Sequence, residues 1–183
     1  MKKGREWILV LLLTLGLTLT ACSAVPGMGE KKTEFEVGEK VSSYWFDFTV
    51  DGVETADRYG EYEAKDGCRL VVCDMTIKNT FGDVVPMNWA DFTLLWPGEG
   101  QSDSSADISL STMEGSYPIP EYSDEQLPDE YEMEKGETRE GTLVFEVPNE
   151  VTKAAVVFQE LYAEGESESK YTEGDHYMVW FSI

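Results

Sequence analysis

The stretch Leu70-Val71-Val72-Cys73-Asp74-Met75-Thr76-Ile77-Lys78-Asn79 decides the fold class of this 183-residue chain. Four alternate side chains in it are apolar and share one face: Val71, Cys73, Met75 and Ile77. Period-two alternation over this length predicts a β-strand from Cys68 to Lys78, closed by Asn79. The shared face is expected to enter a core, with Cys73 as a small core residue.

Similar apolar segments recur along the rest of the chain, separated by turn residues. They predict further strands at 44–50, 92–96, 142–147, 154–161 and 177–183. Helical periodicity is scarce, and one helical turn is expected near Trp89-Ala90-Asp91. About six to eight strands in a segment of about 150 residues predict an all-β fold, an antiparallel sandwich.

Three segments do not read as strands. Residues 98–107 are small and polar, and residues 121–134 are acidic and contain Pro128. Both are predicted to be long exposed loops. Residues 164–175 are expected to form a hairpin connection between the last two strands.

The N-terminus has the layout of a secretory signal. Lys2, Lys3 and Arg5 precede an apolar run from Trp7 to Leu19. A transmembrane helix needs about 20 apolar residues, and this run has about 13, so an export signal is favoured over a membrane anchor.

The end of that run, Leu19-Thr20-Ala21-Cys22, resembles the bacterial lipobox. In that family the cysteine sulfur receives a diacylglycerol and the chain is cut just before it. The resemblance implies a signal peptide at 1–21 and lipidation of Cys22. The small and polar residues that follow predict a flexible tether at 22–34, and the strand pattern that starts at Phe35 predicts a folded domain at 35–183. Two acyl chains hold a soluble domain at a membrane where one chain anchors it only marginally.

The charge of the chain restricts its partners. The formal net charge is −22, and removal of a signal that carries a net charge of +2 leaves −24 on the mature part. Such a surface repels phosphate backbones, so no nucleic-acid partner is expected. It also repels anionic headgroups, so the domain is expected to contact the membrane only through the lipid on Cys22.

Two segments resemble pieces of the bacterial DUF4352 domains, which are telokin-like and immunoglobulin-like. The stretch 70–79 is similar to the family's hydrophobic strand that ends in Lys-Asn. The stretch 135–148, Lys-Gly-Glu-Thr-Arg-Glu-Gly-Thr-Leu-Val-Phe-Glu-Val-Pro, is similar to its Gly-Glu-Thr piece and the Leu-Val-Phe strand after it. The resemblance covers about residues 36–163. It implies an immunoglobulin-like sandwich, here with long acidic loops, and transfers no catalytic residues.

Cysteine and histidine provide no evident catalytic or zinc site. Cys68 and Cys73 lie on opposite faces of one strand, about 16 Å apart, whereas a disulfide needs Cα atoms within about 7 Å. Two free thiols are therefore expected, which favours a Gram-positive exterior. His176 is the only histidine, and it is interpreted as an exposed turn residue before the last strand. These residues do not make a set of zinc ligands or a nucleophile and base.

The acidic loops and the aromatic residues offer two other hypotheses. Oxygen ligands suit calcium, and candidate acids lie at Asp103, Asp107, Asp124, Glu125, Asp129 and Glu130. Solvated loop charge is the favoured interpretation, so no metal or other cofactor is expected. A flat sugar- or peptide-binding face would need exposed rings, and the candidates are Trp45, Trp89, Trp96, Trp180, Tyr122 and Tyr131. Most of these rings are expected in the core, with Trp45 and Trp180 on strand faces opposite the main apolar set.

The sequence thus predicts a lipid-anchored extracytoplasmic binding or adaptor domain without enzymatic activity. Its partner is expected to be an envelope protein or a cell-wall component. The alternative is a calcium-dependent cell-surface module that uses the acidic loops, and a weaker third hypothesis is a sugar-binding module.

Overall fold

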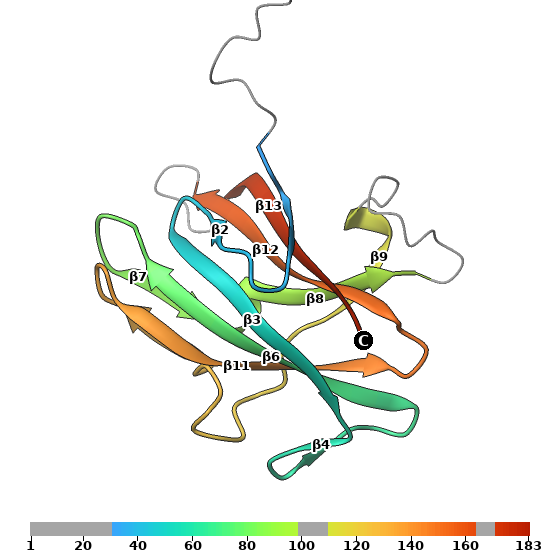
Figure 1. Cartoon of the computed structure of the whole chain (residues 1–183). Coiled ribbons are helices and arrows are strands. Elements are labelled where there is room, and N and C mark those ends of the chain that lie inside the picture. The colour runs from blue at the N-terminus through green and yellow to red at the C-terminus, as the bar shows by residue number, and fades with distance from the viewer. Residues whose placement is uncertain (1–30, 99–109, 164–170) are drawn as a thin grey trace, which may run out of the picture. The chain divides into compact units, whose positions relative to one another are not determined.

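In the computed structural model, which describes residues 31–98, 110–163 and 171–183, the stretch around Val71–Ile77 forms strand β6 (Cys68–Asn79). It lies inside a four-stranded sheet of order β11-β6-β3-β2 (Figure 1). Strand β11 (Thr138–Pro148) and strand β3 (Phe46–Ala56) flank it, both antiparallel, and β2 (Val41–Ser42) pairs with β3. The prediction of a central strand is confirmed, and it extends to Asn79.

The second large sheet has the order β1-β13-β12-β8-β9. Its strands are β1 (Glu34–Glu36), β13 (Tyr171–Ser182), β12 (Lys153–Ala163), β8 (Phe92–Pro97) and β9 (Met113–Ser116). All neighbours are antiparallel except β1 and β13, which are parallel. The predicted antiparallel sandwich is confirmed, with this one parallel pair added at an edge.

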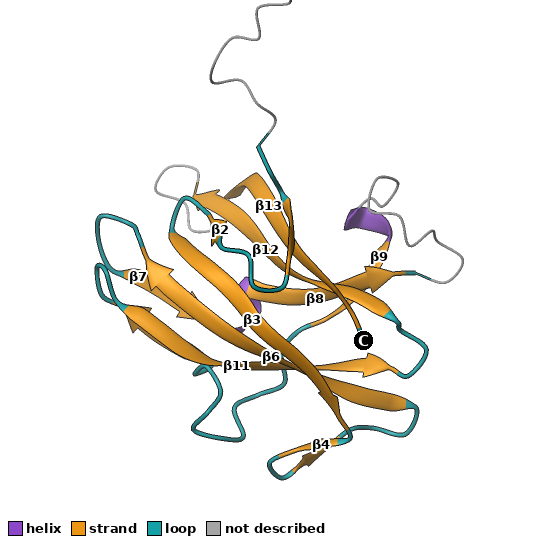
Figure 2. Cartoon of the chain, viewed as in Figure 1, coloured by secondary structure: helices purple, strands orange, loops and turns teal. Residues whose placement is uncertain are grey.

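Short elements complete the described part of the chain (Figure 2). Strands β7 (Val85–Asn88) and β10 (Glu130–Met133) form a separate pair, and so do β4 (Arg58–Tyr59) and β5 (Tyr62–Glu63). Two 3-10 turns, η1 (Trp89–Asp91) and η3 (Leu110–Thr112), precede β8 and β9. The helical turn at η1 is confirmed. A capping box forms it, in which the Asn88 side chain accepts from the Ala90 N–H and Asp91 accepts from the Asn88 N–H.

The main core lies between the two large sheets. Val71, Cys73, Met75 and Ile77 of β6 are at most 1% exposed and enter it together. A group of tilted rings from both sheets packs beside them: Phe46, Phe48, Phe92 and Phe158. Burial of each such side chain stabilises the fold by roughly 1.5–3 kcal/mol relative to leaving it exposed.

The outer faces of both sheets carry smaller apolar clusters. Leu70 and Val72 point away from the main core and pack with Ile119 and Val144, near the β4–β5 hairpin. On the other sheet, Ala155, Val157 and Met178 form a third cluster with Trp180 beside it. Because both faces of β6 are covered, its sequence is a nearly continuous apolar run in place of a strict alternation.

The segment 121–134 is largely outside strands, as predicted, but parts of it are buried or paired. Leu127 is 6% exposed, its N–H donates to the Thr142 carbonyl, and residues 130–133 form β10. This segment covers the outer edge of β11, which would otherwise present unpaired backbone groups. Residues 99–109, which include Asp103 and Asp107, lie outside the described residues.

Both ends of the domain differ from the sequence-based expectation. The last strand begins at Tyr171, so the hairpin connection to β12 is shorter than predicted. At the other end, the folded unit begins at Lys32, because β1 pairs with β13 from Glu34 and the Lys32 ammonium pairs with Glu39 at 2.7 Å. The described residues contain no helix long and apolar enough to cross a membrane. Residues 1–30, with the predicted signal peptide and Cys22, are not among them.

Candidate functional site

A groove between β7 and β12, called here the β7–β12 groove, is the best candidate for a binding site. It encloses about 490 Å³. Its walls come from the residue before β3, all of β7, the end of η1, and the facing ends of β12 and β13. Aromatic and aliphatic side chains predominate, among them Trp45, Phe158 and Leu161, while the polar side chains include Asn88, Asp91 and Gln159.

The groove exists because β8 and β12 stay paired over only part of their length. The pairing ends at Phe92 and Phe158, and at this point the chain on the β8 side turns through η1 into β7. Strand β7 pairs with β10 and does not continue the large sheet. From Gln159 onward β12 stays paired with β13, but its other edge has no β8 partner and lines an opening.

Asp91 is the one acidic side chain in the groove lining, and it is half-buried. Its carboxylate accepts hydrogen bonds from the Asn88 backbone N–H at 2.7 Å and from Asn88 Nδ2 at 3.2 Å. Burial raises the pKa of Asp91, and the backbone hydrogen bond from Asn88 opposes this in part. The ion pairs found among the described residues do not include Asp91, and the groove lining has no lysine or arginine.

The rim of the groove exposes large side chains to solvent. Tyr171 is 56% exposed and Leu161 is 48% exposed. Trp45, at the back, packs among three other rings: Tyr44, Phe81 and Tyr162. Exposed apolar side chains gathered at one opening are typical of interaction sites, whereas single ones scattered over a surface are ordinary.

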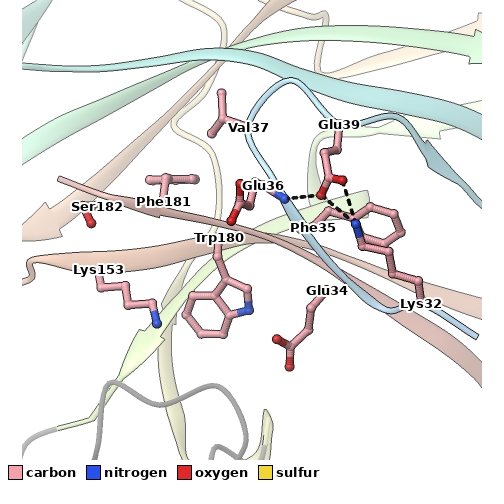
Figure 3. A pocket seen from close by; sticks show the side chains of 10 residues that line it. All are labelled: Lys32, Glu34, Phe35, Glu36, Val37, Glu39, Lys153, Trp180, Phe181 and Ser182. Atoms are coloured by element: carbon pink, nitrogen blue, oxygen red, sulfur yellow. Dashed lines mark hydrogen bonds and ion pairs between the residues drawn. The ribbon is translucent and has the colours of Figure 1, made fainter. Parts of the chain in front are cut away.

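A second hollow lies beside the paired strands β1 and β13 (Figure 3). It is larger, at about 860 Å³, and mixes both signs of charge around Trp180. Lys32 is paired with Glu39, and the Lys153 ammonium lies 4.8 Å from the centre of the Trp180 ring. The Trp180 indole N–H is buried without a hydrogen-bond partner. Because both lysines of its lining already lie beside groups of the same chain, this hollow is the weaker candidate for a site.

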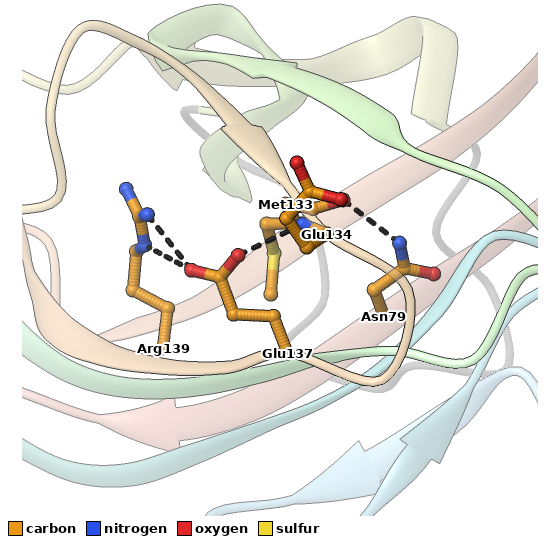
Figure 4. A network of polar contacts seen from close by, with 5 residues as sticks. All are labelled: Asn79, Met133, Glu134, Glu137 and Arg139. Carbon is orange, nitrogen blue, oxygen red and sulfur yellow. Dashed lines mark hydrogen bonds and ion pairs between the residues drawn. The ribbon is translucent and has the colours of Figure 1, made fainter.

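The two segments that resemble the DUF4352 pieces meet in a polar network (Figure 4). Asn79, only 1% exposed, donates from Nδ2 to the carbonyls of Asp83 and Met133, both at 2.9 Å. Its Oδ1 accepts from the Phe81 N–H at 2.8 Å. Glu137 accepts from the Glu134 N–H and from Arg139, each at 2.8 Å. This network fixes the turns around β6, β10 and β11, so its role is structural.

A buried carboxylate at Glu160 ties the two large sheets together. Glu160 is 1% exposed, and its Oε1 accepts from the Tyr44 backbone N–H at 2.7 Å and the Tyr177 hydroxyl at 2.9 Å. Its Oε2 accepts from the Tyr162 hydroxyl at 2.7 Å. Buried charge requires such hydrogen bonding. Since Tyr44 directly precedes the Trp45 wall, Glu160 positions one side of the β7–β12 groove.

The cysteine prediction is confirmed, and the histidine prediction is wrong. Cys68 and Cys73 are free thiols, and Cys73 is fully buried, which raises the pKa of its thiol. His176 does not lie in an exposed turn before the last strand. It lies within β13, opposite Gln159 of β12, and is half-buried because that strand begins at Tyr171.

The six aromatic candidates do not form one flat face. Trp96 is buried, Trp89 contacts Tyr117, Tyr122 contacts Tyr62, and Tyr131 lies under the Arg139 guanidinium. Trp180 lies on the outer sheet face, as predicted. Trp45 packs against the main core, contrary to the prediction, because the Ser43 turn ends just before β3 and the strand alternation starts only at Phe46.

The acidic candidates of the described loop segment do not converge. Asp129 accepts a hydrogen bond from the Glu121 N–H at 3.2 Å. Among the residues that the structure describes, no group of three or more histidine, cysteine or acidic side chains is placed to hold a metal ion. The residues that matter in the groove, Asp91, Leu161 and Tyr171, carried no sequence signal, since each lay in a segment interpreted as a turn, a core strand or a loop.

The fold and the groove define a small β-sandwich domain with a groove between β7 and β12. A family model described as "Domain of unknown function (DUF4352)" matches residues 35–168. The chain therefore belongs to the DUF4352 family, and the resemblance seen in its sequence is confirmed. Among the curated proteins, none matches the chain.

Solved structures from Bacillus share the fold. The candidate lipoprotein ycdA of Bacillus subtilis is 18% identical with a TM-score of 0.50; the match covers 84% of this chain but only 39% of that one. The yjhA protein of Bacillus subtilis is 17% identical with a TM-score of 0.51, over 68% of this chain and 81% of that one. An uncharacterized β-sandwich protein of Clostridium difficile 630 is 19% identical with a TM-score of 0.46, over 85% and 99% of the two chains. At these identities the first two likenesses show the fold alone.

Proposed function

We propose that the mature chain is a lipid-anchored, extracytoplasmic binding or adaptor domain without enzymatic activity. The β7–β12 groove carries the proposal. It combines apolar walls, an exposed aromatic rim and a half-buried carboxylate in one opening of about 490 Å³. Concave, largely apolar sites with a few polar groups are the usual form of a ligand-binding site.

The side chains of the groove suit binding better than catalysis. The lining contains no serine, cysteine or histidine, so a nucleophile and base pair has no place there. The Cys73 thiol lies in the main core, where burial raises its pKa and keeps it from acting as a thiolate. The Asp91 carboxylate, held by hydrogen bonds from Asn88, is suited to binding a positively charged group of a partner.

The proposed location follows from the segment that ends at Cys22. A lipid on Cys22 would hold the domain on the outer face of a membrane, in the Gram-positive envelope that the free thiols favour. The partner there would be an envelope protein or a cell-wall component. Expression in a Gram-positive host with an alkyne-bearing fatty acid tests the anchor: the wild type is expected to carry the label and Cys22→Ser to lose it. An equal label on both would contradict the anchor.

Site-specific photo-crosslinking on intact cells tests the binding function. A photoreactive residue replaces Tyr171 at the groove rim in one variant and Tyr122 in a matched control. Both tyrosines are exposed, at 56% and 48%, but only Tyr171 lines the groove. Discrete adducts are expected from position 171 and not from 122. Adducts from neither, or the same adducts from both, would overturn the groove as the binding site, and turnover that Asp91→Asn abolishes would overturn the non-enzymatic assignment.

A further inference from the structure

If the β7–β12 groove binds a partner as proposed, its side chains also indicate the chemical class of the group that it receives. We infer that the β7–β12 groove receives a basic side chain, a lysine or arginine of a partner protein that is flanked by apolar residues. The cationic head would lie at the Asp91 carboxylate. The hydrocarbon parts would lie against Trp45 and Leu161.

Asp91 is the first argument for a cation. Within the described part of the chain, its carboxylate accepts from the backbone and side-chain nitrogens of Asn88, both neutral groups. No lysine or arginine within the described residues forms an ion pair with it. Partial burial makes its negative charge costly in the free protein, and a charge-assisted hydrogen bond from a partner would offset that cost.

The aromatic walls are the second argument. A cation gains when it lies within about 6 Å of the face of a tryptophan or tyrosine ring. Elsewhere in the described chain such places are filled from within: Lys32 lies over Phe35, Arg139 over Tyr131 and Lys153 over Trp180. No described lysine or arginine lies over Trp45 or Tyr171. Tyr171, which is 56% exposed, therefore offers its ring to a cation from outside, and the part of Trp45 that lines the groove adds an aromatic wall.

The third argument is the charge of the whole domain. A net charge of −24 on the mature chain attracts basic partners over a distance and speeds their encounter. The same negative charge repels anionic partners from the groove. The hollow beside β1 and β13 is a poorer place for a cation from a partner, because the chain's own lysines already fill it. Lys32 lies beside Glu39, and Lys153 lies beside Trp180.

The test uses the mature chain with Cys22→Ser, so that it stays in solution, and three labelled heptapeptides. The first has two lysines among valine and phenylalanine residues, and its twins carry glutamine or glutamate in place of lysine. Fluorescence anisotropy is expected to show the lysine peptide binding at least about tenfold more tightly than the glutamine twin, and the glutamate twin not binding. Equal binding of the lysine and glutamine peptides would overturn the inference.

Two variants separate the groove from the general charge of the domain. Asp91→Asn is expected to weaken binding of the lysine peptide about tenfold, while Glu61→Gln, which removes the same charge from the exposed β4–β5 turn, leaves it nearly unchanged. Leu161→Arg, which does not touch the η1 cap, is expected to weaken it at least as much. Equal effects of Asp91→Asn and Glu61→Gln would show a nonspecific attraction. If no peptide binds while crosslinks from position 171 persist, the cationic class is wrong and the binding function stands.

Discussion

Asn79 and Asp91 lie on either side of strand β7 in the sequence, and they differ in burial and in hydrogen-bond partners. Asn79 is buried and all its side-chain groups that can bond have partners within the chain. Asp91 is half-buried, carries an ionisable carboxyl group and, among the described residues, accepts hydrogen bonds from the neutral groups of Asn88. The difference teaches where to look for function: a polar group satisfied internally maintains the fold, whereas one left incompletely compensated at an opening is available to a partner.

The largest expected loss of stability comes from replacing Asn79, the residue whose hydrogen bonds are all made within the chain. Asn79→Ala leaves the Phe81 N–H, the buried Met133 carbonyl and the partly buried Asp83 carbonyl without this partner, and a buried polar group costs about 1–3 kcal/mol when unsatisfied. The free energy of unfolding is therefore expected to fall by about 3 kcal/mol. Urea denaturation measures it. Asn88→Ala, which removes the η1 cap at the surface, is the matched control and is expected to cost about 1 kcal/mol; equal losses would contradict the contrast.

The buried carboxylate of Glu160 is expected to give the second-largest effect. Glu160→Gln keeps the shape of the side chain but replaces one acceptor oxygen with a donor. The amide oxygen can still accept from the Tyr44 N–H and the Tyr177 hydroxyl, and the Tyr162 hydroxyl can accept from the new amide nitrogen. These bonds lose the help of the negative charge, so a loss of about 1–2 kcal/mol is expected. Thermal denaturation gives the loss. Glu146→Gln, at a carboxylate on the outer sheet face, is the control. An equal loss of stability in this variant would show that the loss at Glu160 does not come from its bridge between the two sheets.

Gly136 tests the turn that completes the Asn79 network. Its φ of +78° is a conformation that other residues rarely adopt. Gly136→Ala is therefore expected to destabilise the domain by about 1 kcal/mol. Gly82 also has open space around its Cβ position but no positive φ, so Gly82→Ala is expected to be neutral or slightly stabilising. If both substitutions change the free energy of unfolding equally, the positive φ at Gly136 does not make that turn intolerant of a side chain.

Asp91→Asn is expected to change stability least among the substitutions, within about 0.5 kcal/mol at neutral pH. The amide oxygen of the new side chain can still accept from the Asn88 N–H. Burial raises the pKa of Asp91 in the folded state, so the folded protein holds this proton better than the unfolded chain. Wild-type stability from this group is greatest below the unfolded pKa and declines as pH rises through the folded pKa. The variant is expected to gain relative to the wild type across that window, and an opposite slope in urea titrations at several pH values would contradict the burial of Asp91.

Calcium is expected to have the smallest effect. The described acidic side chains do not gather in a group that could hold a metal ion. The melting temperature in millimolar calcium is therefore expected to lie within about 1 °C of that with a chelator, because a ligand stabilises only when it binds the folded state. A clear calcium-dependent rise would revive the alternative of a calcium-dependent surface module.

The fold was predictable because its main strands repeat with period two. The alternation of Val71, Cys73, Met75 and Ile77 predicts a buried strand face without any tertiary information, and the DUF4352 resemblance implies a sandwich. The order of the strands within each sheet was not predictable from the sequence and comes from the structure. The groove was not predictable in this way. Asp91 becomes special only because β8 and β12 part at Phe92 and Phe158, and Tyr171 because β13 starts earlier than its apolar pattern does. Trp45 was placed on the wrong face since the Ser43 turn, and not the alternation, sets its direction.

The parallel pairing of β1 with β13 has a mechanical consequence. A pull on an anchor at Cys22 would enter the sandwich through Glu34–Glu36, which pair with Met178–Trp180, and through the bond from the Met178 N–H to the Thr33 carbonyl. A force applied along the β1 axis would load these bonds together in shear rather than open them one after another. The three-residue pairing of β1 with β13 would then carry the tension between an anchor at Cys22 and a bound partner.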